Sequence, residues 1–392
     1  MRMTSAAKSG TEITADIAAV HRCATQKQRP AMALLWVIAL LCCGLRPQLA
    51  SATVAAASDP ATLDPATFAP ATFQAPDGAL TLNPGGNYVE PYFATKALIV
   101  AQDGGLNVSE AAGAWIGWAL PRQRPSGLFR RFCRANPAHN ANPDIANTND
   151  AWRDCAAADA DDSMLALWMQ LLYRMAPATG LPAEWQRSLT LSEKQLAKLR
   201  NRRLGVYHIS GRNHVALLMD NIEVYAALKD VARAQLRLDD PSAVAADAQA
   251  DQLAAAIQRI FWDRRAQRFR PSMQKTRAAF YPDVVAQVYP WLADMSGPGQ
   301  DPRQAWQQWK KTFGAGWIER RYDPQPWGLV ALAAEKEGDA ASAVCWTQQS
   351  DSLRGSSTWN VLEEAVWQSL RARFSQPQRL DPQVCTALVS QS

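Results

Sequence analysis

The chain has 392 residues, of which 48% are hydrophobic and 20% are charged, and its formal net charge is +5. This is the composition of an ordinary globular protein, long enough for one large domain or two smaller ones. The basic residues form only short runs, such as Arg130-Arg131, without interleaved stacking aromatics. A groove for nucleic acid is therefore not expected.

The N-terminal segment has the pattern of an export signal. Basic residues precede an apolar run at residues 31–45, and an A-x-A-like site follows at Ala50-Ser51-Ala52. We expect residues 1–52 to be a cleavable signal peptide, which places the mature protein in the periplasm or outside the cell. The apolar run is short for a membrane span, so an uncleaved anchor is the less favoured alternative.

Residues 53–76 are rich in Ala, Pro and Thr and contain three near-copies of one phrase, DPATL, DPATF and APATF. Such a tract is typical of a flexible linker. The folded domain is then expected to cover residues 77–392, and we expect it to be a monomer.

Four cysteines remain after signal cleavage, an even number that favours two disulfides in an exported protein. Three pairings are possible. Proximity in the sequence favours Cys133–Cys155 and Cys345–Cys385. No C-x-x-C pair or histidine spacing indicates zinc, and no phosphate-binding glycine loop occurs, so neither a metal nor another cofactor is predicted.

The folded part is predicted to be all-α. Apolar residues recur there with helical spacing, and strand-like alternation is nearly absent. About eleven or twelve helices favour a double ring of paired helices, because a simple bundle of this size would split. The predicted helices are 91–102, 108–120, 163–175, 191–201, 212–236, 248–262, 283–294, 303–312, 326–337, 339–349 and 360–373.

Acidic residues stand where several of these helices begin. Asp159, Asp161 and Asp162 directly precede an apolar helix. Aspartate is a favoured N-cap, yet one cap needs one residue, and three nearby carboxylates repel one another. The cluster therefore indicates a functional site as well as capping.

Glu90 stands before Pro91, which suits the first position of a helix. The positive end of the helix dipole should lower the pKa of Glu90. Burial beside Tyr92 and its aromatic neighbours would have to outweigh that effect for Glu90 to act as a general acid.

Asp220 lies on an apolar stripe with Val224 and Leu228, and Glu223 is one turn further on. A buried ion pair with Arg212 or another basic group would explain Asp220. Alternatively, Asp220 and Glu223 are carboxylates of a cleft that binds substrate or activates water.

Asp283 follows Pro282 at a helix start, and Gln287 lies one turn later on the same face. Capping explains Asp283 but does not explain Gln287. A carboxylate and an amide on one face are a suitable clamp for hydroxyl groups.

These segments resemble the six-hairpin glycosidases, which are (α/α)6 barrels, over about residues 84–375. The segment NYVEPYFATKAL resembles the first barrel helix of family-8-type glycoside hydrolases, and Asp159-Ala160-Asp161 resembles their D-x-D stretch. The segments LMDNIEVYAAL and FYPDVVAQVYPWL look like inner helices of the wider superfamily. The resemblance implies that Glu90 is the general acid and that the aspartates hold the sugar at the cleaved bond. Asp220 and Asp283 compete for the role of general base.

The function expected from these residues is hydrolysis of a polysaccharide, with inversion favoured over retention. Most of the fifteen tryptophans should fill the core, while some should line a sugar-binding groove. The alternatives are a non-catalytic glycan-binding or assembly factor on the same barrel, and a helical interaction scaffold. The residues expected to bind substrate are Asp159, Asp161, Asp162, Tyr92, Glu223, Gln287, Trp115, Trp152 and Trp327.

Overall fold

The computed structural model describes residues 66–134, 151–275, 278–374 and Cys385. They belong to the larger of two compact units, which spans Leu63–Ser392. The predicted signal peptide and residues 53–65 of the predicted linker lie outside the described residues. The described residues are mostly helical, with a few short strands, and form an all-α (α/α) barrel.

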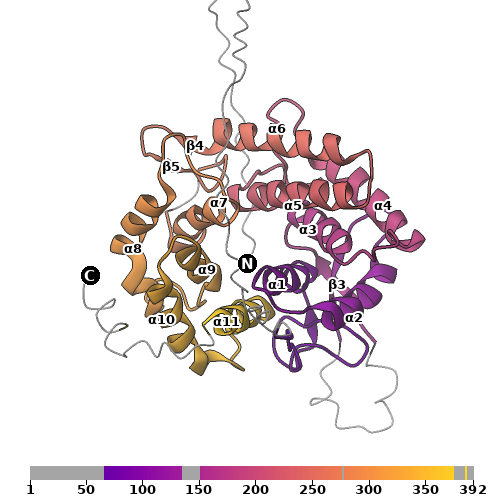
Figure 1. Cartoon of the computed structure of the whole chain (residues 1–392), viewed down its shortest axis with the longest axis horizontal. Coiled ribbons are helices and arrows are strands. Elements are labelled where there is room, and N and C mark those ends of the chain that lie inside the picture. The colour runs from indigo at the N-terminus through magenta and orange to yellow at the C-terminus, as the bar shows by residue number, and fades with distance from the viewer. Residues whose placement is uncertain (1–65, 135–150, 276–277, 375–384, 386–392) are drawn as a thin grey trace, which may run out of the picture. The chain divides into compact units, whose positions relative to one another are not determined.

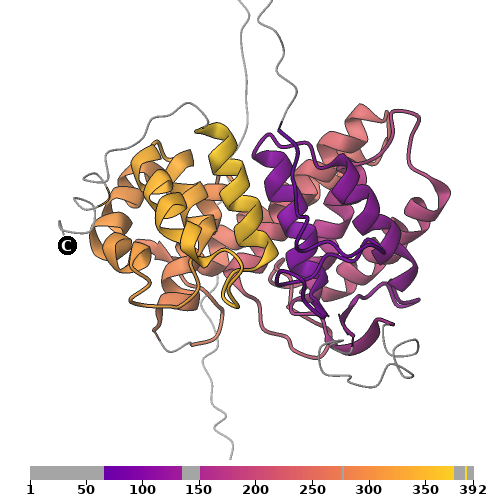
Figure 2. The same cartoon turned by 90° about the horizontal axis from the view of Figure 1, so that it is seen from below.

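The centre of the unit is a closed ring of alternate helices. Each inner helix packs on the next, and the last, α11, packs on the first, α1. Figures 1 and 2 both show α11 beside α1, although more than 250 residues separate them in the sequence. The inner helices are α1 (Pro91–Asp103), α3 (Asp161–Arg174), α5 (Leu218–Arg237), α7 (Val288–Leu292), α9 (Gly328–Lys336) and α11 (Val361–Arg373).

The other helices cover this ring from outside. Helix α4 packs on α3, α6 packs on α5, and α10 packs on α9. Around the ring in Figure 1, inner and outer helices alternate along the chain. The outer helices are α2 (Ser109–Ala119), α4 (Ala183–Leu199), α6 (Ala243–Phe261), α8 (Pro302–Ile318) and α10 (Ala340–Ser350).

The burial pattern separates inner from outer helices, as expected from their sequences. On the inner helix α3 every residue from Asp162 to Tyr173 is buried. On the outer helix α4 buried and exposed positions alternate at helical spacing, and the buried ones include Leu189 and Leu196. A helix with apolar neighbours on all sides belongs inside, whereas a helix with one apolar stripe belongs at the surface.

Several helix starts differ from prediction, two of them by more than five residues. Helix α4 begins eight residues earlier than expected, at Ala183, directly after Pro182. Helix α5 begins six residues later, because Leu217 forms a β-bridge with Ser272 and keeps the preceding segment extended. Apolar spacing alone cannot show this non-local pairing.

The short strands were also missed by helical periodicity. Strands β1 (Tyr88–Val89), β2 (Arg130–Cys133) and β3 (Arg153–Ala157) form an antiparallel sheet in the order β1-β2-β3. Strands β4 (Trp262–Asp263) and β5 (Arg268–Phe269) form a hairpin. Segments of two to five residues are too short to show an alternating pattern.

The predicted disulfide pairing is confirmed. Cys133 is bonded to Cys155, which ties β2 to β3, and Cys345 is bonded to Cys385. The second bond links α10 to the C-terminal segment. In the described part of the chain, no helix is long and apolar enough to cross a membrane.

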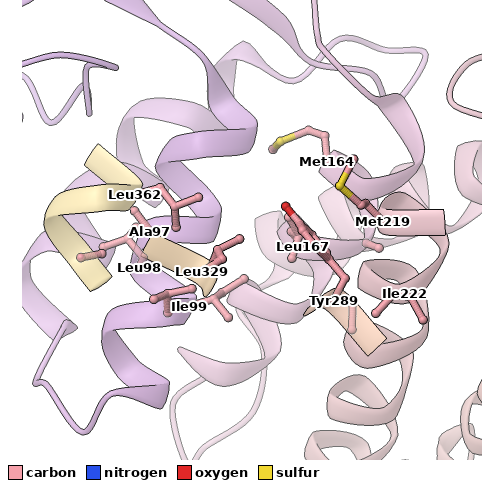
Figure 3. Close-up of a cluster of buried hydrophobic side chains, with 14 of the residues drawn as sticks. Ala97, Leu98, Ile99, Met164, Leu167, Met219, Ile222, Tyr289, Leu329 and Leu362 are labelled. Carbon is pink, nitrogen blue, oxygen red and sulfur yellow. The ribbon is translucent and has the colours of Figure 1, made fainter. Parts of the chain in front are cut away.

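An apolar cluster fills the middle of the inner ring (Figure 3). Its side chains come from all six inner helices. The labelled members are Ala97, Leu98, Ile99, Met164, Leu167, Met219, Ile222, Tyr289, Leu329 and Leu362.

The linker is predicted to extend to residue 76, but residues 66–76 pack against the folded unit. Phe68 and Phe73 are both buried in the main core. The backbone N–H of Phe68 donates to the carbonyl of Asn107, and the amide of Gln368 on α11 bonds to both backbone groups of Ala69. Residues 66–76 are therefore part of the folded unit, because two phenylalanines in a tract rich in Ala, Pro and Thr anchor it.

The Phe73→Ala substitution should test this boundary. Phe73 is only 2% exposed, so its removal should lower the free energy of unfolding by about 3–5 kcal/mol. Urea unfolding followed by circular dichroism measures the loss. The exposed neighbour Thr72 supplies the control, because Thr72→Ala removes no core contact. Equal stability of the two variants would mean that this segment is a linker.

Candidate active site

A cavity of about 390 Å³ opens at the end of the ring where the inner helices begin. Each of the six inner helices contributes its first turn or the residues just before it. The inner helices must therefore run in the same direction, with their N-terminal ends converging. The residues with polar or aromatic side chains in the wall are Asn83, Tyr92, Phe93, Asp159, Asp220, Tyr281, Tyr289, Asp323, Gln325, Trp327, Ser357, Thr358, Asn360 and Glu363.

A second cavity of about 700 Å³ lies at the opposite end of the ring, where the inner helices end. Its charged side chains are paired with one another. Arg174 binds Asp103 and Asp230, and Lys336 binds Asp294. This cavity is the larger of the two, but its charged side chains neutralise one another. The smaller cavity is therefore the better candidate for an active site.

Asp220 is the most unusual residue of the smaller cavity. It lies in the first turn of α5, it is 8% exposed, and no described residue hydrogen-bonds to its Oδ2 atom. Burial and, to a smaller extent, the charge of Asp159 raise the pKa of Asp220 to about 7, and the charge of Lys96 on α1 opposes this shift. The expected buried ion pair with Arg212 or another basic group is not formed among the described residues: Lys96 acts on Asp220 only through its charge, and its own ion pair is with Glu223. A carboxyl with a pKa near neutrality and a free oxygen can donate or accept a proton.

The predicted aspartate cluster lies beside Asp220 but divides into different environments. Asp159 lines the cavity, and its Oδ1 atom accepts a hydrogen bond of 2.9 Å from Arg131. Asp162 is fully buried, and burial together with the charge of Asp220 raises its pKa. Burial raises the pKa of Asp161 to about 6, with Arg130 opposing the shift. The residue before α3 is Ala160, which offers no side-chain cap, while Oδ1 of Asp162 accepts a hydrogen bond of 3.0 Å from the backbone N–H of Ser163 in the first turn.

Glu363, in the first turn of α11, is a functional candidate that the sequence analysis missed. Its Oε2 atom accepts a hydrogen bond of 2.8 Å from the backbone N–H of Gly328, at the start of α9. Burial raises the pKa of Glu363 to about 7, and the Gly328 N–H opposes the shift. A Cβ atom on residue 328 would lie 2.5 Å from Oε2, so only glycine allows this approach.

Two aromatic rings form one wall of the cavity. Tyr281 and Trp327 stack with ring centroids 4.7 Å apart and an interplanar angle of 19°. Trp327 has a φ angle of 51°, a left-handed conformation that costs energy for a bulky residue. No described group accepts a hydrogen bond from its buried indole N–H. Strain and an unsatisfied donor at one residue are typical of a functional site.

Glu90 stands behind this cavity, and its side chain is not part of the wall. It is 2% exposed and forms an ion pair with Arg131, which also binds Asp159. Burial raises the pKa of Glu90 to about 7, and Arg131 opposes the shift. Glu90 therefore positions the guanidinium group of Arg131, and Arg131 in turn binds Asp159.

Tyr92 and Glu223 connect the cavity to the buried centre of the ring. The Tyr92 hydroxyl donates a hydrogen bond of 2.8 Å to Oε1 of Glu223, and Lys96 forms an ion pair with the same atom. Tyr92 lines the smaller cavity, whereas Glu223 and Lys96 line the larger one. Glu223 is thus placed below the candidate site.

The remaining predicted site residues lie outside the cavity wall, apart from Trp327. The Oδ2 atom of Asp283 accepts a hydrogen bond from the backbone of Ala279. Both amide atoms of Gln287 bond to the backbone of Phe269. Trp115 is fully buried, and the indole N–H of Trp152 donates to Asp77. These side chains satisfy structural needs that their sequence positions alone do not reveal.

Among the residues that the structure covers, no cluster of three or more His, Cys, Asp or Glu side chains could hold a metal ion. The polar groups that face the smaller cavity are mainly carboxyls, amides and hydroxyls. This set can exchange protons and form hydrogen bonds with a hydroxyl-rich ligand.

No family model matches the chain, and no curated protein matches it. Several solved structures are similar. An uncharacterised conserved protein from Thermus thermophilus has a TM-score of 0.49 and 12% identity over 76% of this chain and 96% of that chain. A GH63 mannosylglycerate hydrolase from the same organism has a TM-score of 0.46 and 11% identity over 75% and 95% of the two chains.

A rhamnosidase from Klebsiella oxytoca has a TM-score of 0.46 and 11% identity over 72% of this chain and 58% of that chain. At these values the similar structures assign no family to the chain. The resemblance to family-8-type hydrolases therefore stays a prediction.

The raised pKa of Asp220 predicts a pH-dependent effect of Asp220→Asn on stability. The folded state keeps the Asp220 proton up to about pH 7, whereas the unfolded state loses it near the ordinary value of 3.8. The wild type therefore loses stability as the pH rises between these values, and the asparagine variant avoids this loss. Relative to wild type, the variant should gain on the order of 2–4 kcal/mol between about pH 4 and pH 8.

Urea unfolding at the two pH values measures this gain. Glu110→Gln is the matched control, because Glu110 lies exposed at the start of α2. If Asp220→Asn gained no more stability than the control, burial would not destabilise the ionised form of Asp220.

Proposed function

We propose that the protein is an exported glycoside hydrolase whose acid and base are Asp220 and Glu363. The observation that supports this most is that both carboxyls line one cavity of sugar-binding size and both have a pKa raised to about 7. Glycosidic bonds are cleaved by two carboxyl groups on opposite sides of the bond, one protonated and one ionised.

The surroundings of the two carboxyls favour different roles. Both carboxyls lie in the first turn of a helix, but only Glu363 accepts a described backbone N–H, that of Gly328, and this hydrogen bond favours its ionised form. The Oδ2 atom of Asp220 has no partner among the described groups and faces negative charge from Asp159, which favours its protonated form. Asp220 is thus the proposed general acid and Glu363 the proposed general base.

In this mechanism Asp220 protonates the glycosidic oxygen as the bond to the anomeric carbon breaks. Glu363 removes a proton from the water that attacks this carbon from the other side. Inversion requires the two carboxyls to stand about 6.5–9.5 Å apart, with room for that water. Asp159, Asn83 and Gln325 supply hydrogen-bonding groups for hydroxyls, and the Tyr281–Trp327 stack supplies a flat apolar surface for a sugar ring.

The other residues predicted for catalysis receive supporting roles. Glu90 positions Arg131 and, through it, Asp159. Tyr92 lines the cavity and hydrogen-bonds to Glu223 beneath it, next to the Lys96 ammonium that acts on Asp220. Export remains part of the proposal and rests on the N-terminal pattern and the two disulfides.

Removal of either carboxyl should abolish most of the activity. We expect Asp220→Asn and Glu363→Gln each to lower kcat by about 10²–10⁴-fold, with the fold unchanged, because each removes one proton transfer. Glu90→Gln should have a smaller effect, since Glu90 acts through Arg131. Reducing-sugar release from a panel of glycans, with circular dichroism of each variant, measures these changes.

Wild-type levels of hydrolysis in Asp220→Asn or Glu363→Gln would refute the assignment. Binding of oligosaccharides without hydrolysis by the wild type would instead favour a non-catalytic glycan-binding protein on the same barrel. Glu110→Gln is again the control for a lost surface charge.

A further inference from the structure

The charge of the cavity wall limits what kind of sugar can bind. Four carboxyl side chains line the cavity, those of Asp159, Asp220, Asp323 and Glu363. Among its described lining residues there is no lysine, arginine or histidine. A ligand in this cavity therefore meets carboxyl groups and no cationic side chain of the described wall.

The basic residues behind the wall are already paired. Arg131 binds Glu90 and Asp159, and Lys96 binds Glu223. The N-terminal ends of the inner helices add positive partial charge, but this charge falls off within the first turn. A ligand beyond the first turn therefore meets little of this positive charge.

One part of the rim combines a carboxyl with exposed aromatic surface. Tyr281 is 46% exposed, and the ring that it stacks on belongs to Trp327. The charge of Asp323 acts on the Tyr281 hydroxyl, so the two groups are neighbours. The Oδ1 atom of Asp323 accepts the backbone N–H of Gln325, and no ion pair to Asp323 is formed within the described part of the chain. A carboxylate beside an aromatic face is the arrangement that binds an ammonium group.

A second observation points to a ligand here, independently of the number of acidic groups. Asp220 is more than nine-tenths buried, lines the cavity, and leaves its Oδ2 atom without a partner in the described structure. A buried polar atom of this kind needs a partner that the protein itself does not supply.

We propose that the cavity binds an amino sugar with a free ammonium group, held at the rim by Asp323 and the Tyr281–Trp327 stack. This inference rests on the proposed function and specifies its substrate. Acidic sugars such as uronates are excluded, because their carboxylates would meet like charges without a compensating cation. N-acetylated sugars lack the charge that the rim recognises.

Binding of four simple sugars to the full chain tests the proposal directly. Glucosamine, N-acetylglucosamine and glucuronate each differ from glucose at one substituent, and isothermal titration calorimetry compares the four sugars at a pH where the amine is charged. We expect glucosamine to bind about tenfold more tightly than glucose or N-acetylglucosamine, with glucuronate the weakest. High salt should reduce this preference.

The Asp323→Asn variant keeps the Oδ1 acceptor for Gln325 and removes the charge. It should lose the preference for glucosamine over glucose. Glu110→Gln should keep the preference. Equal binding of glucosamine and glucose by the wild type, or no binding of glucosamine, would overturn the proposal.

Hydrolysis of glucosamine polymers and of their acetylated and neutral counterparts separates this inference from the proposed function. Cleavage of the neutral polymers but not of those with free amines would overturn the inference and leave the hydrolase intact. Selective binding of glucosamine without cleavage of any polymer would refute the hydrolase and leave the ammonium site.

Discussion

The packing of α11 on α1 closes the inner ring, and the candidate site depends on that contact. Near the closing point, the Val361 N–H donates to the carbonyl of Leu82, and the Asn83 amide donates to the carbonyl of Trp359. These bonds fix the start of α11 beside the segment that precedes α1. Without them Glu363 would not reach Gly328 or share a cavity with Asp220, which lies more than 100 residues earlier in the chain.

The two ends of the inner ring differ in the charged residues that line their cavities. Tyr289 and Leu329 of the apolar cluster line both a cavity with paired charges and a cavity whose described wall has carboxyls but no lysine, arginine or histidine. Burial of an unpaired carboxyl destabilises the fold unless the group keeps its proton. Such a cost is typical of sites where the unsatisfied group is used by a ligand or a reaction.

The sequence predicted the double ring, both disulfides and the unusual position of Asp220, because helical periodicity, cysteine spacing and an acid on an apolar stripe are local patterns. It missed Glu363 because Glu363 and Glu364 follow Asn360 like an ordinary capped helix start, and Glu364 does pair with Arg354. It could not show that the Gln287 amide hydrogen-bonds to the backbone of Phe269, because Phe269 lies in a hairpin too short to recognise from sequence. Long-range contacts thus decide which polar residues face the cavity and which instead form hydrogen bonds with the backbone.

A crystal structure of the Glu363→Gln protein with a bound oligosaccharide would test the central claim most directly. The account predicts a sugar in the cavity at the N-terminal ends of the inner helices, with the glycosidic oxygen about 2.6–3.2 Å from an Asp220 oxygen. It also predicts residue 363 on the opposite side of the scissile bond. A sugar bound elsewhere, with Asp220 and residue 363 far from its glycosidic bonds, would contradict the account.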